Sequence, residues 1–115
     1  MPRTRRATTG SMVGTTVHLA RGEWQISRVY ATLGRSEPAL WHARRCLELI
    51  EAAPEAEDWD LPFAYEALAR AHGVAQAKAE ASHFARLAQE AGERIADPED
   101  RELLLADLET LPVAG

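Results

Sequence analysis

The sequence predicts an all-α protein, and three observations carry this prediction. Alanine, the residue with the highest helix propensity, supplies 22 of the 115 residues. Apolar side chains recur at helical spacings of three and four in five segments, with Gly or Pro between most of them. In addition, much of the chain matches itself when it is shifted so that Arg28 falls on Arg70. The length fits a single domain with its own core.

The first two helices are expected within residues 17–53. Gly34 suits the left-handed position just past the end of a helix spanning about 17–33, and Ser36 is the predicted N-cap of the next helix. Pro54 ends that second helix. The first helix shows a predicted amphipathic stripe formed by Leu19, Ile26, Val29, Tyr30 and Leu33. The second helix is expected to direct six side chains inward: Ala39, Leu40, Ala43, Cys46, Leu47 and Ile50.

A second pair of helices is expected within residues 61–95. An acidic loop over 54–60 precedes it, and Asp60 is the predicted cap of the helix that follows. That helix, about 61–75, is apolar at Leu61, Tyr65, Leu68 and Ala69. The next, about 77–95, is apolar at Ala81, Phe84, Ala85, Leu87, Ala88 and Ala91. The tryptophans Trp41 and Trp59 do not fall on obvious core positions.

A capping helix is expected over residues 98–110. Asp97 is its predicted N-cap, with Pro98 in the first helical position and acidic residues in the first turn, where they complement the helix dipole. Leu104 and Leu108 are expected to cover the preceding helix. Residues 1–16 lack helical periodicity and are expected to form a flexible arm, so that 17–115 is the single folded domain.

The spacing from Arg28 to Arg70, which we call the repeat offset, relates the two predicted helix pairs. Identical pairs at this offset are Arg28 and Arg70, Ala39 and Ala81, Ala43 and Ala85, Arg44 and Arg86, Glu48 and Glu90, and Glu51 and Glu93. Conservative pairs include Ile26 with Leu68, Ser27 with Ala69 and Cys46 with Ala88. Two helical hairpins of one size in tandem are expected to be two copies of one supersecondary unit.

The spacing of small residues resembles the tetratricopeptide repeat (TPR). Ser27 and Ala69 fall where helix A of that repeat has a small side chain, and Ala39-x3-Ala43-x2-Cys46 resembles the ladder of small residues in helix B. The second copy departs from the pattern, because Gln76 replaces the turn glycine and His72 replaces the aromatic residue. The resemblance covers residues 17–95 and implies two tandem TPR-like hairpins with a period of about 42 residues, followed by the capping helix.

Three longer strings look similar to a group of small bacterial TPR-like proteins of unassigned function. They are the segments Arg21–Tyr30, Phe63–Ala71 and Asp97–Leu104. This resemblance implies the fold and a binding role, and it implies no reaction. In such hairpins the A helices line a concave groove that binds a partner.

The groove-facing positions expected from this resemblance include arginine at the equivalent place in both hairpins. Arg28 and Arg70 are suited to capturing carboxylates, and Trp24 offers an apolar anchor. We therefore predict that the groove binds a protein or an acidic peptide segment. The alternative is an internal network, in which Glu66 pairs with Arg70 and Arg28 reaches Glu66 across the helices. The predicted groove residues are Arg21, Trp24, Arg28, Phe63, Glu66 and Arg70, with Thr32 and Val74 beyond them.

Self-association is a second prediction, because two repeats leave one end of the array uncovered. The expected capping helix covers the C-terminal end only. The first helix and Trp41 are left partly bare, so a homodimer that buries this end is expected. A self-assembling structural subunit with no other ligand is thus the main alternative function, and a small-ligand sensor or enzyme is a further one.

Charge and motifs narrow the remaining function classes. The net charge is −5, with +6 in residues 1–45 and −11 in residues 46–115, and a basic groove on an acidic body is one outcome that this division allows. Arg3, Arg5 and Arg6 give only a weak signal for nucleic-acid binding. No apolar run is long enough to span a membrane, so a cytoplasmic protein is expected.

No catalytic residues, cofactor or metal site are predicted. The sequence has no phosphate-binding glycine loop and no nucleophile motif. His42 and Cys46 have a spacing that can hold a metal, but Cys46 lies on the predicted core ladder and is expected to be a buried apolar residue.

Overall fold

The computed structural model describes residues 15–112, and all of its regular structure is α-helical. Most of the predicted flexible arm lies outside the described residues, but Thr15 and Thr16 already belong to the first helix. None of the described helices is both long and apolar enough to cross a membrane. The helices are α1 (Thr15–Thr32), α2 (Ser36–Glu51), α3 (Asp60–Val74), α4 (Lys78–Gly92) and α5 (Pro98–Glu109).

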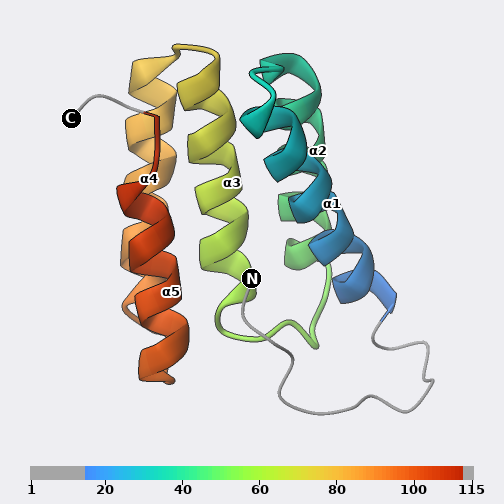
Figure 1. Cartoon of the computed structure of the whole chain (residues 1–115). Coiled ribbons are helices and arrows are strands. Elements are labelled where there is room, and N and C mark those ends of the chain that lie inside the picture. Colours follow the sequence, from blue (N-terminus) through green and yellow to red (C-terminus); the bar gives the residue numbers. More distant parts are fainter. Residues whose placement is uncertain (1–14, 113–115) are drawn as a thin grey trace.

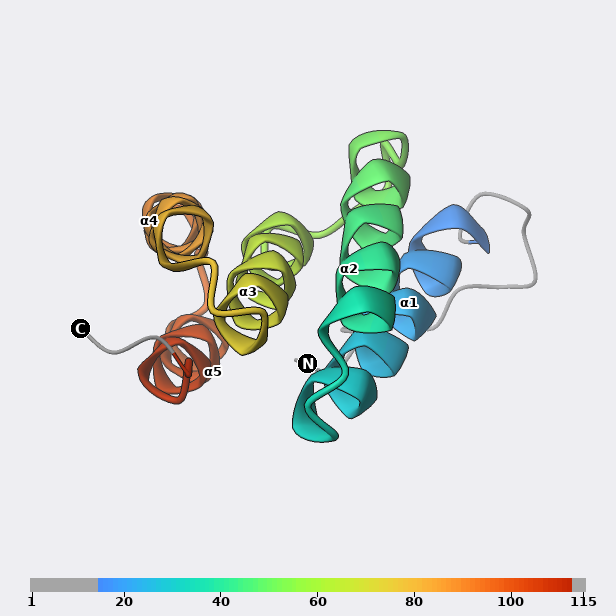
Figure 2. The same ribbon diagram turned by 90° about the horizontal axis from the view of Figure 1, so that it is seen from above.

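The five helices run alternately up and down and lie in two rows (Figure 1). Seen from above, α1, α3 and α5 form one row, and α2 and α4 form the other (Figure 2). The most extensive packing is between α1 and α2 and between α3 and α4, and α2 also packs closely on α3. As a result, α3 contacts all four other helices, whereas α1 lies at one end of the molecule with α4 and α5 at the other.

The core lies around α3, where two large aromatic side chains are fully enclosed. Phe63 and Trp59 are buried near the start of α3, and Leu104 of α5 is buried in the same hydrophobic cluster. Elsewhere small residues fill the contacts, because closely crossing helices leave no room for larger side chains. The fully buried small residues include Ala20, Ala39, Ala43, Cys46, Ala64, Ala69, Ala71, Ala81 and Ala88.

The face of α1 that points inward differs from the predicted stripe. Leu19, Ile26, Val29 and Leu33 are exposed, and only Tyr30 of the predicted set is partly buried. The inward face consists of Val17, Ala20, Trp24, Ser27 and Ala31. The prediction was wrong because it placed the aliphatic side chains inward, while the close contact with α2 takes small residues and Trp24 of the same face contacts Phe63 of α3.

Two helix starts and one tryptophan also differ from the predictions. Ser36 and Asp60 are the first residues of α2 and α3 and make no capping hydrogen bond there, since the N-cap positions are Arg35 and Trp59. Trp59 is buried, although no periodic pattern had assigned it to the core.

The start of α5 is as predicted. Asp97 is the N-cap, and its Oδ1 accepts hydrogen bonds from the backbone N–H groups of Glu99 (2.8 Å) and Asp100 (3.4 Å). Leu104 packs so closely on α4 that a Cβ atom added to Gly92 would lie 2.3 Å from its Cδ2 atom. This helix therefore covers α4 through Leu104, while Leu103 and Leu105 are exposed.

The turn between α1 and α2 recurs between α3 and α4 at the repeat offset. Gly34 has φ +75° and Gln76 has φ +62°, so the left-handed conformation is kept although the glycine is not. The bond from the N–H of Arg35 to the carbonyl of Tyr30 (2.9 Å) matches the bond from Ala77 to His72 (2.9 Å).

Ring contacts next to these turns recur at the same offset. Tyr30 stacks on His42 with ring centroids 5.8 Å apart, and His72 stacks on Phe84 at 5.5 Å. The edge contact of Trp41 with His42 likewise corresponds to that of His83 with Phe84. The α1–α2 and α3–α4 pairs are thus built alike around their turns, with histidine and an aromatic residue exchanged.

Candidate functional site

The six residues predicted to line the groove lie on the facing sides of α1 and α3, and α5 closes one side of this region. Trp24, Phe63 and Glu66 are buried, whereas the three arginines are partly buried. We call the three arginines and the carboxylates that they contact the arginine cluster, formed by Arg21, Arg28, Arg70, Asp60, Glu66 and Asp107.

Arg21 pairs with Asp60, the first residue of α3. Its Nε and Nη2 donate to the two carboxylate oxygens of Asp60 at 3.0 and 2.9 Å, a bidentate geometry. The guanidinium also lies over the ring of Trp59, 4.3 Å from its centroid. Asp60 is fully buried and accepts a further bond from the backbone N–H of Glu57 (2.8 Å). This residue therefore fixes α1, α3 and the preceding loop together.

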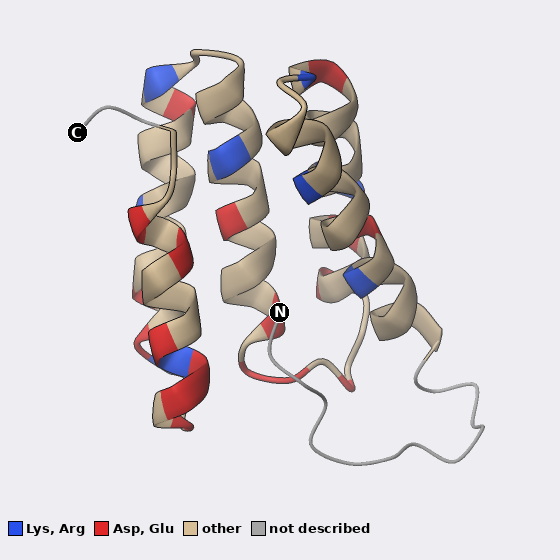
Figure 3. Cartoon of the chain, in the orientation of Figure 1, with Lys and Arg blue, Asp and Glu red and all other residues tan. Residues whose placement is uncertain are grey.

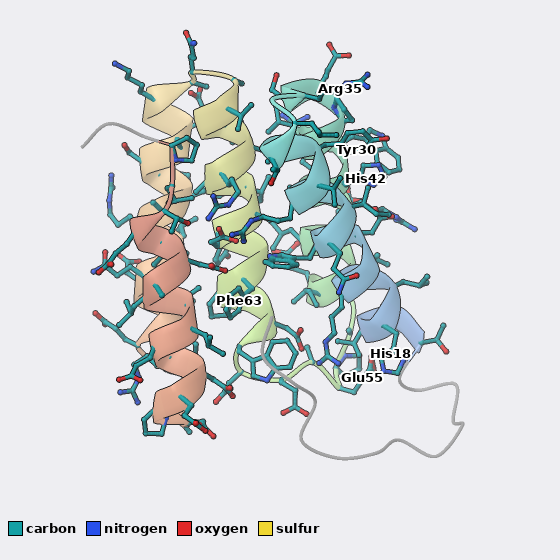
Figure 4. The ribbon with its side chains drawn as sticks, in the orientation of Figure 1. His18, Tyr30, Arg35, His42, Glu55 and Phe63 are labelled. Atoms are coloured by element: carbon teal, nitrogen blue, oxygen red, sulfur yellow. The ribbon has the colours of Figure 1, made fainter. Side chains whose placement is uncertain are left out.

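Trp24 and Phe63 form an apolar contact between α1 and α3. Their rings meet edge to face with centroids 6.0 Å apart, and the indole Nε1 of Trp24 donates to the backbone carbonyl of Phe63 (3.2 Å). Both side chains are buried; Phe63 is labelled on α3 in Figure 4. In this arrangement Trp24 holds two helices together, and the apolar anchor expected for a partner lies inside the molecule.

Glu66 is the buried centre of the cluster. Its Oε2 accepts from Nε of Arg70 (2.9 Å), lies 2.7 Å from Nη2 of the same residue, and lies 3.9 Å from Nη1 of Arg28. The other oxygen, Oε1, has no hydrogen-bond partner among residues 15–112. Burial of the side chain raises the pKa of Glu66 above its ordinary value, Arg70 opposes the shift, and nearby Asp107 adds to it.

The end of α5 supplies further partners for the arginines. Nη1 of Arg28 contacts Oδ2 of Asp107 at 3.3 Å. Arg70 donates to the backbone carbonyl of Asp107 (3.1 Å), to Oγ1 of Thr110 (2.7 Å) and to the carbonyl of Thr110 (3.4 Å). Arg28 thereby bridges α1 and α5, and Arg70 links α3 to the last turn of α5.

The cluster matches the internal network that the sequence left open as an alternative. Arg28 and Arg70 do converge with Arg21 on one face, but each of the three contacts a carboxylate of the same chain. The expected basic groove is therefore charge-compensated here. The acidic side chains gather mainly in the loop over 54–60 and in α5 (Figure 3).

Three members of the region were not predicted as site residues: Asp60, Asp107 and Thr110. The sequence predicts Asp60 as a helix N-cap and α5 as a helix that covers α4. Neither prediction makes these residues partners of an arginine. One regularity links the contacts of α1 with α3, because Arg21 with Asp60 and Trp24 with Phe63 are both separated by 39 residues. That separation follows from the packing of α1 beside α3 and has no local signal in the sequence.

A second group of side chains lies at the outer edge of α1 and α2. His42 contacts Glu23 through Nδ1 and lies between the rings of Tyr30 and Trp41 (Figure 4 labels Tyr30, His42 and the nearby Arg35). Trp41, the predicted self-association residue, is 59% exposed. It lines a shallow, open depression together with Arg44, Arg45 and Glu48.

Metal-ligating residues do not assemble into a site in the described part of the chain. Residues 15–112 contain no group of three His, Cys, Asp or Glu side chains that could hold a metal ion. Cys46 is buried, and burial raises the pKa of its thiol to about 12. Burial also lowers the pKa of His72, with Arg44 adding to the shift.

A comparison of the chain with models of known protein families, with curated proteins and with solved structures finds no match. The functional inference therefore rests on the geometry of the chain itself: an arginine cluster between α1, α3 and α5, and an exposed outer side of α1 and α2.

Proposed function

We propose that this chain is a non-catalytic protein–protein interaction module built of two tandem TPR-like hairpins with α5 as the C-terminal cap. The proposal is supported by the features that recur at the repeat offset. These are the left-handed turn residues Gly34 and Gln76, the turn hydrogen bonds, and the ring stacks of the two helix pairs. A bacterial, cytoplasmic setting belongs to the same proposal and rests on the sequence alone.

The proposed binding surface is the face shared by α1, α3 and α5, and the proposed ligand is an acidic segment of a partner protein. The observation that carries this proposal is the contact of Arg28 with Asp107 at 3.3 Å, in which the face already accepts a carboxylate. The Arg28 and Asp107 side chains are 32% and 26% exposed, so this ion pair can be reached from solvent. A partner carboxylate can replace Asp107 at modest cost, because exposed ion pairs are weak.

The other two arginines have different roles in this proposal. Arg70 is held by the buried Glu66 and by two backbone carbonyls, and Arg21 is held in a bidentate pair with the buried Asp60. Breaking these contacts would leave a carboxylate buried without its partner, which is expensive. The two residues therefore keep the surface in shape, and Arg28 provides the exchangeable contact.

A titration with acidic peptides tests the proposal. The probe is a fluorescent peptide rich in Asp and Glu, and the control peptide has Asn and Gln at the same positions. Asp107→Ala removes the internal competitor and is expected to tighten binding of the acidic peptide, whereas Arg28→Ala is expected to weaken it. Arg45→Ala, which removes an exposed arginine from α2, is the matched control and should bind like the unmodified chain. Equal binding by Arg28→Ala and the unmodified chain would show that the cluster is purely an internal network.

A further inference from the structure

The outward side of α1 carries an apolar stripe. Leu19, Gly22, Ile26, Val29 and Leu33 follow one another at alternating steps of three and four residues, which is the a/d spacing of helices that pack in pairs. The four side chains are exposed, Leu19 by 55% and Leu33 by 64%. A Cβ atom added to Gly22 would meet nothing within 4 Å. We call these five positions the α1 seam.

The opposite side of the same helix is also apolar, since Val17, Ala20, Trp24 and Ala31 are buried against α2 and α3. A helix that is apolar on two opposite sides is typical of a buried position, with neighbours on both sides. In the described chain α1 has neighbours on one side only, because it forms one end of the molecule (Figure 2).

No charged side chain lies on the exposed part of α1. Its three charged residues are partly buried and each contacts a polar side chain of the same chain: Arg21 contacts Asp60, Glu23 contacts His42 and Arg28 contacts Asp107. The outward side chains include no Asp, Glu, Lys or Arg: Thr15, His18, Leu19, Gln25, Ile26, Val29, Thr32 and Leu33. This surface can be covered by a neutral apolar partner without burying an unpaired charge.

The opposite end of the molecule has a different surface. The exposed residues of α4 include Lys78, Glu80, Arg86 and Glu90, and none of its large apolar side chains is strongly exposed. The depression beside Trp41 on α2 is bordered by Arg44, Arg45 and Glu48. Helix α5 exposes Leu103 and Leu105, but its exposed residues also include Glu99, Glu102 and Glu109. The uncharged α1 seam is therefore not matched by α4, by α5 or by the surroundings of Trp41, and the surface that does match it is its own copy.

We propose that α1 packs antiparallel against α1 of a second copy of this chain, around a two-fold axis close to Ile26. The seam is self-complementary in this arrangement, because Leu19 lies toward the partner's Leu33 and the gap at Gly22 receives a larger side chain. Antiparallel packing also brings the opposite ends of the helix dipoles together. Residues 1–14 are a poorer occupant, because their three arginines would find no carboxylate on the exposed part of α1.

The size of the seam limits the area that this dimer can bury. The 18 residues of α1 span ~27 Å, and a helix with its side chains is ~10 Å wide. One such face covers about 300 Å², which is well below the ~800 Å² that each partner buries in a standard stable interface. We therefore expect a reversible dimer that dissociates at micromolar concentrations, and this inference does not depend on the proposed binding of acidic segments.

Sedimentation analysis of the full chain between about 5 and 500 µM tests the proposal. The mass is expected to rise from monomer toward dimer across this range. Leu19→Arg places a charge in the seam and should weaken the dimer by at least ~10-fold. Leu103→Arg is the matched control, because Leu103 is 50% exposed but lies on α5, and it should leave the dimer unchanged. Circular dichroism verifies that both variants keep their helices.

A disulfide tests the geometry. Ile26→Cys brings two cysteines together across the axis and should form a disulfide-linked dimer, which needs Cα atoms within about 7 Å. Leu33→Cys should not, because an antiparallel pair separates the two copies of residue 33 by about 20 Å. The native Cys46 is buried and does not compete.

Four results would overturn the proposal. The first is a chain that stays monomeric across the concentration range while the thiol introduced by Ile26→Cys is freely modified, which would point to another protein as the occupant. The chain stays monomeric and that introduced thiol is protected, which points to residues 1–14. Trp41→Arg abolishes the dimer while Leu19→Arg does not, which places the interface on α2. Leu33→Cys cross-links as well as Ile26→Cys, which excludes the antiparallel arrangement.

Discussion

The two helix pairs share their turns and ring contacts but differ in how well they are covered. In the pair α3–α4, α3 is buried between its neighbours and α4 is covered by α5 through Leu104 and Gly92. In the pair α1–α2, the outward side of α1 stays exposed and apolar. A helix pair thus contributes to the core where it has neighbours on both sides and leaves an exposed apolar surface where it lies at the end of the molecule.

The facing sides of α1 and α3 also differ in chemistry at matching positions. At the repeat offset, Arg28 corresponds to Arg70, but Trp24 corresponds to Glu66. The first position holds a ring bonded to a backbone carbonyl, and the second holds a buried carboxylate bonded to arginine. The two helix pairs therefore have small residues at matching helix contacts and differ in the side chains of this face.

The largest expected effect comes from uncovering the second pair. Leu104→Ala removes a fully buried side chain between α4 and α5, and we expect a loss of about 3 kcal/mol in the free energy of unfolding. Urea denaturation measures it. Leu103→Ala on the same helix, where the side chain is half exposed, should change the stability by less than about 0.5 kcal/mol. Similar losses in both variants would mean that α5 does not cover α4 in the way described.

The next expected effect concerns Glu66, the buried carboxylate that corresponds to Trp24 at the repeat offset. The pKa of Glu66 is raised in the folded chain, so the folded state binds its proton more tightly than the unfolded state does. The stability that this proton provides is complete below the ordinary glutamate pKa and is lost as the pH rises through the folded pKa. The unmodified chain should therefore lose stability relative to Glu66→Gln as the pH rises from about 4 toward neutrality.

Urea denaturation of both proteins at a series of pH values measures this difference. The contribution of His72, whose pKa is shifted too, is common to both proteins and cancels. Glu48→Gln, at an exposed position, is the control and should run parallel to the unmodified chain. A difference that grows in favour of the unmodified chain with rising pH would show that Arg70 and Arg28 outweigh the burial of Glu66.

Helix positions were largely predictable from the sequence, because their signals are local. The turn at Gly34, the cap at Asp97 and the small residues at Ala39, Ala43 and Cys46 each act within a few residues of chain. The all-helical structure and the burial of the alanine ladder follow from such signals. The second turn was recognised at Gln76 only through its repeat offset, since glutamine is not a residue that favours positive φ.

The orientation of α1 and the partners of the arginines were not predictable in the same way. Helical spacing alone cannot rank two apolar sides of one helix, and the side with the leucine, isoleucine and valine stripe that was predicted to be buried is exposed. The pairing of Arg21 with Asp60, and of Arg28 with Asp107, joins residues 39 and 79 positions apart. These pairs exist because tertiary packing brings α1, α3 and α5 together, which no local pattern encodes.

A smaller effect on stability should distinguish the contact between α1 and α2 from the contact between α3 and α4. Oγ of Ser27 donates to the carbonyl of Ala39 at 2.9 Å in a buried contact, and the matching residue of the second pair is Ala69. Ser27→Ala is expected to cost about 1 kcal/mol by removing this hydrogen bond. Ala69→Ser, which can donate to the matching carbonyl of Ala81, should cost less than that if the two crossings are alike. Thermal unfolding of the two variants compares them directly, and a larger loss for Ala69→Ser would show that the second crossing is tighter.

The smallest expected effect lies in the turns themselves. Gln76 holds φ +62°, which costs a residue with a side chain about 1–2 kcal/mol, whereas glycine adopts it freely. Glycine also gains freedom in the unfolded chain, which offsets about 0.5–1 kcal/mol of that benefit. Gln76→Gly should therefore stabilise the chain by about 0.5 kcal/mol, and Gly34→Ala should destabilise it by a similar amount. Because a Cβ atom at Gly34 meets nothing within 4 Å, steric crowding cannot explain the expected loss of stability in Gly34→Ala. Opposite changes of similar size in the free energy of unfolding, measured by urea denaturation, would show that the two turns impose the same backbone conformation. A lower free energy of unfolding in both variants would mean that the side chain of Gln76 makes stabilising contacts.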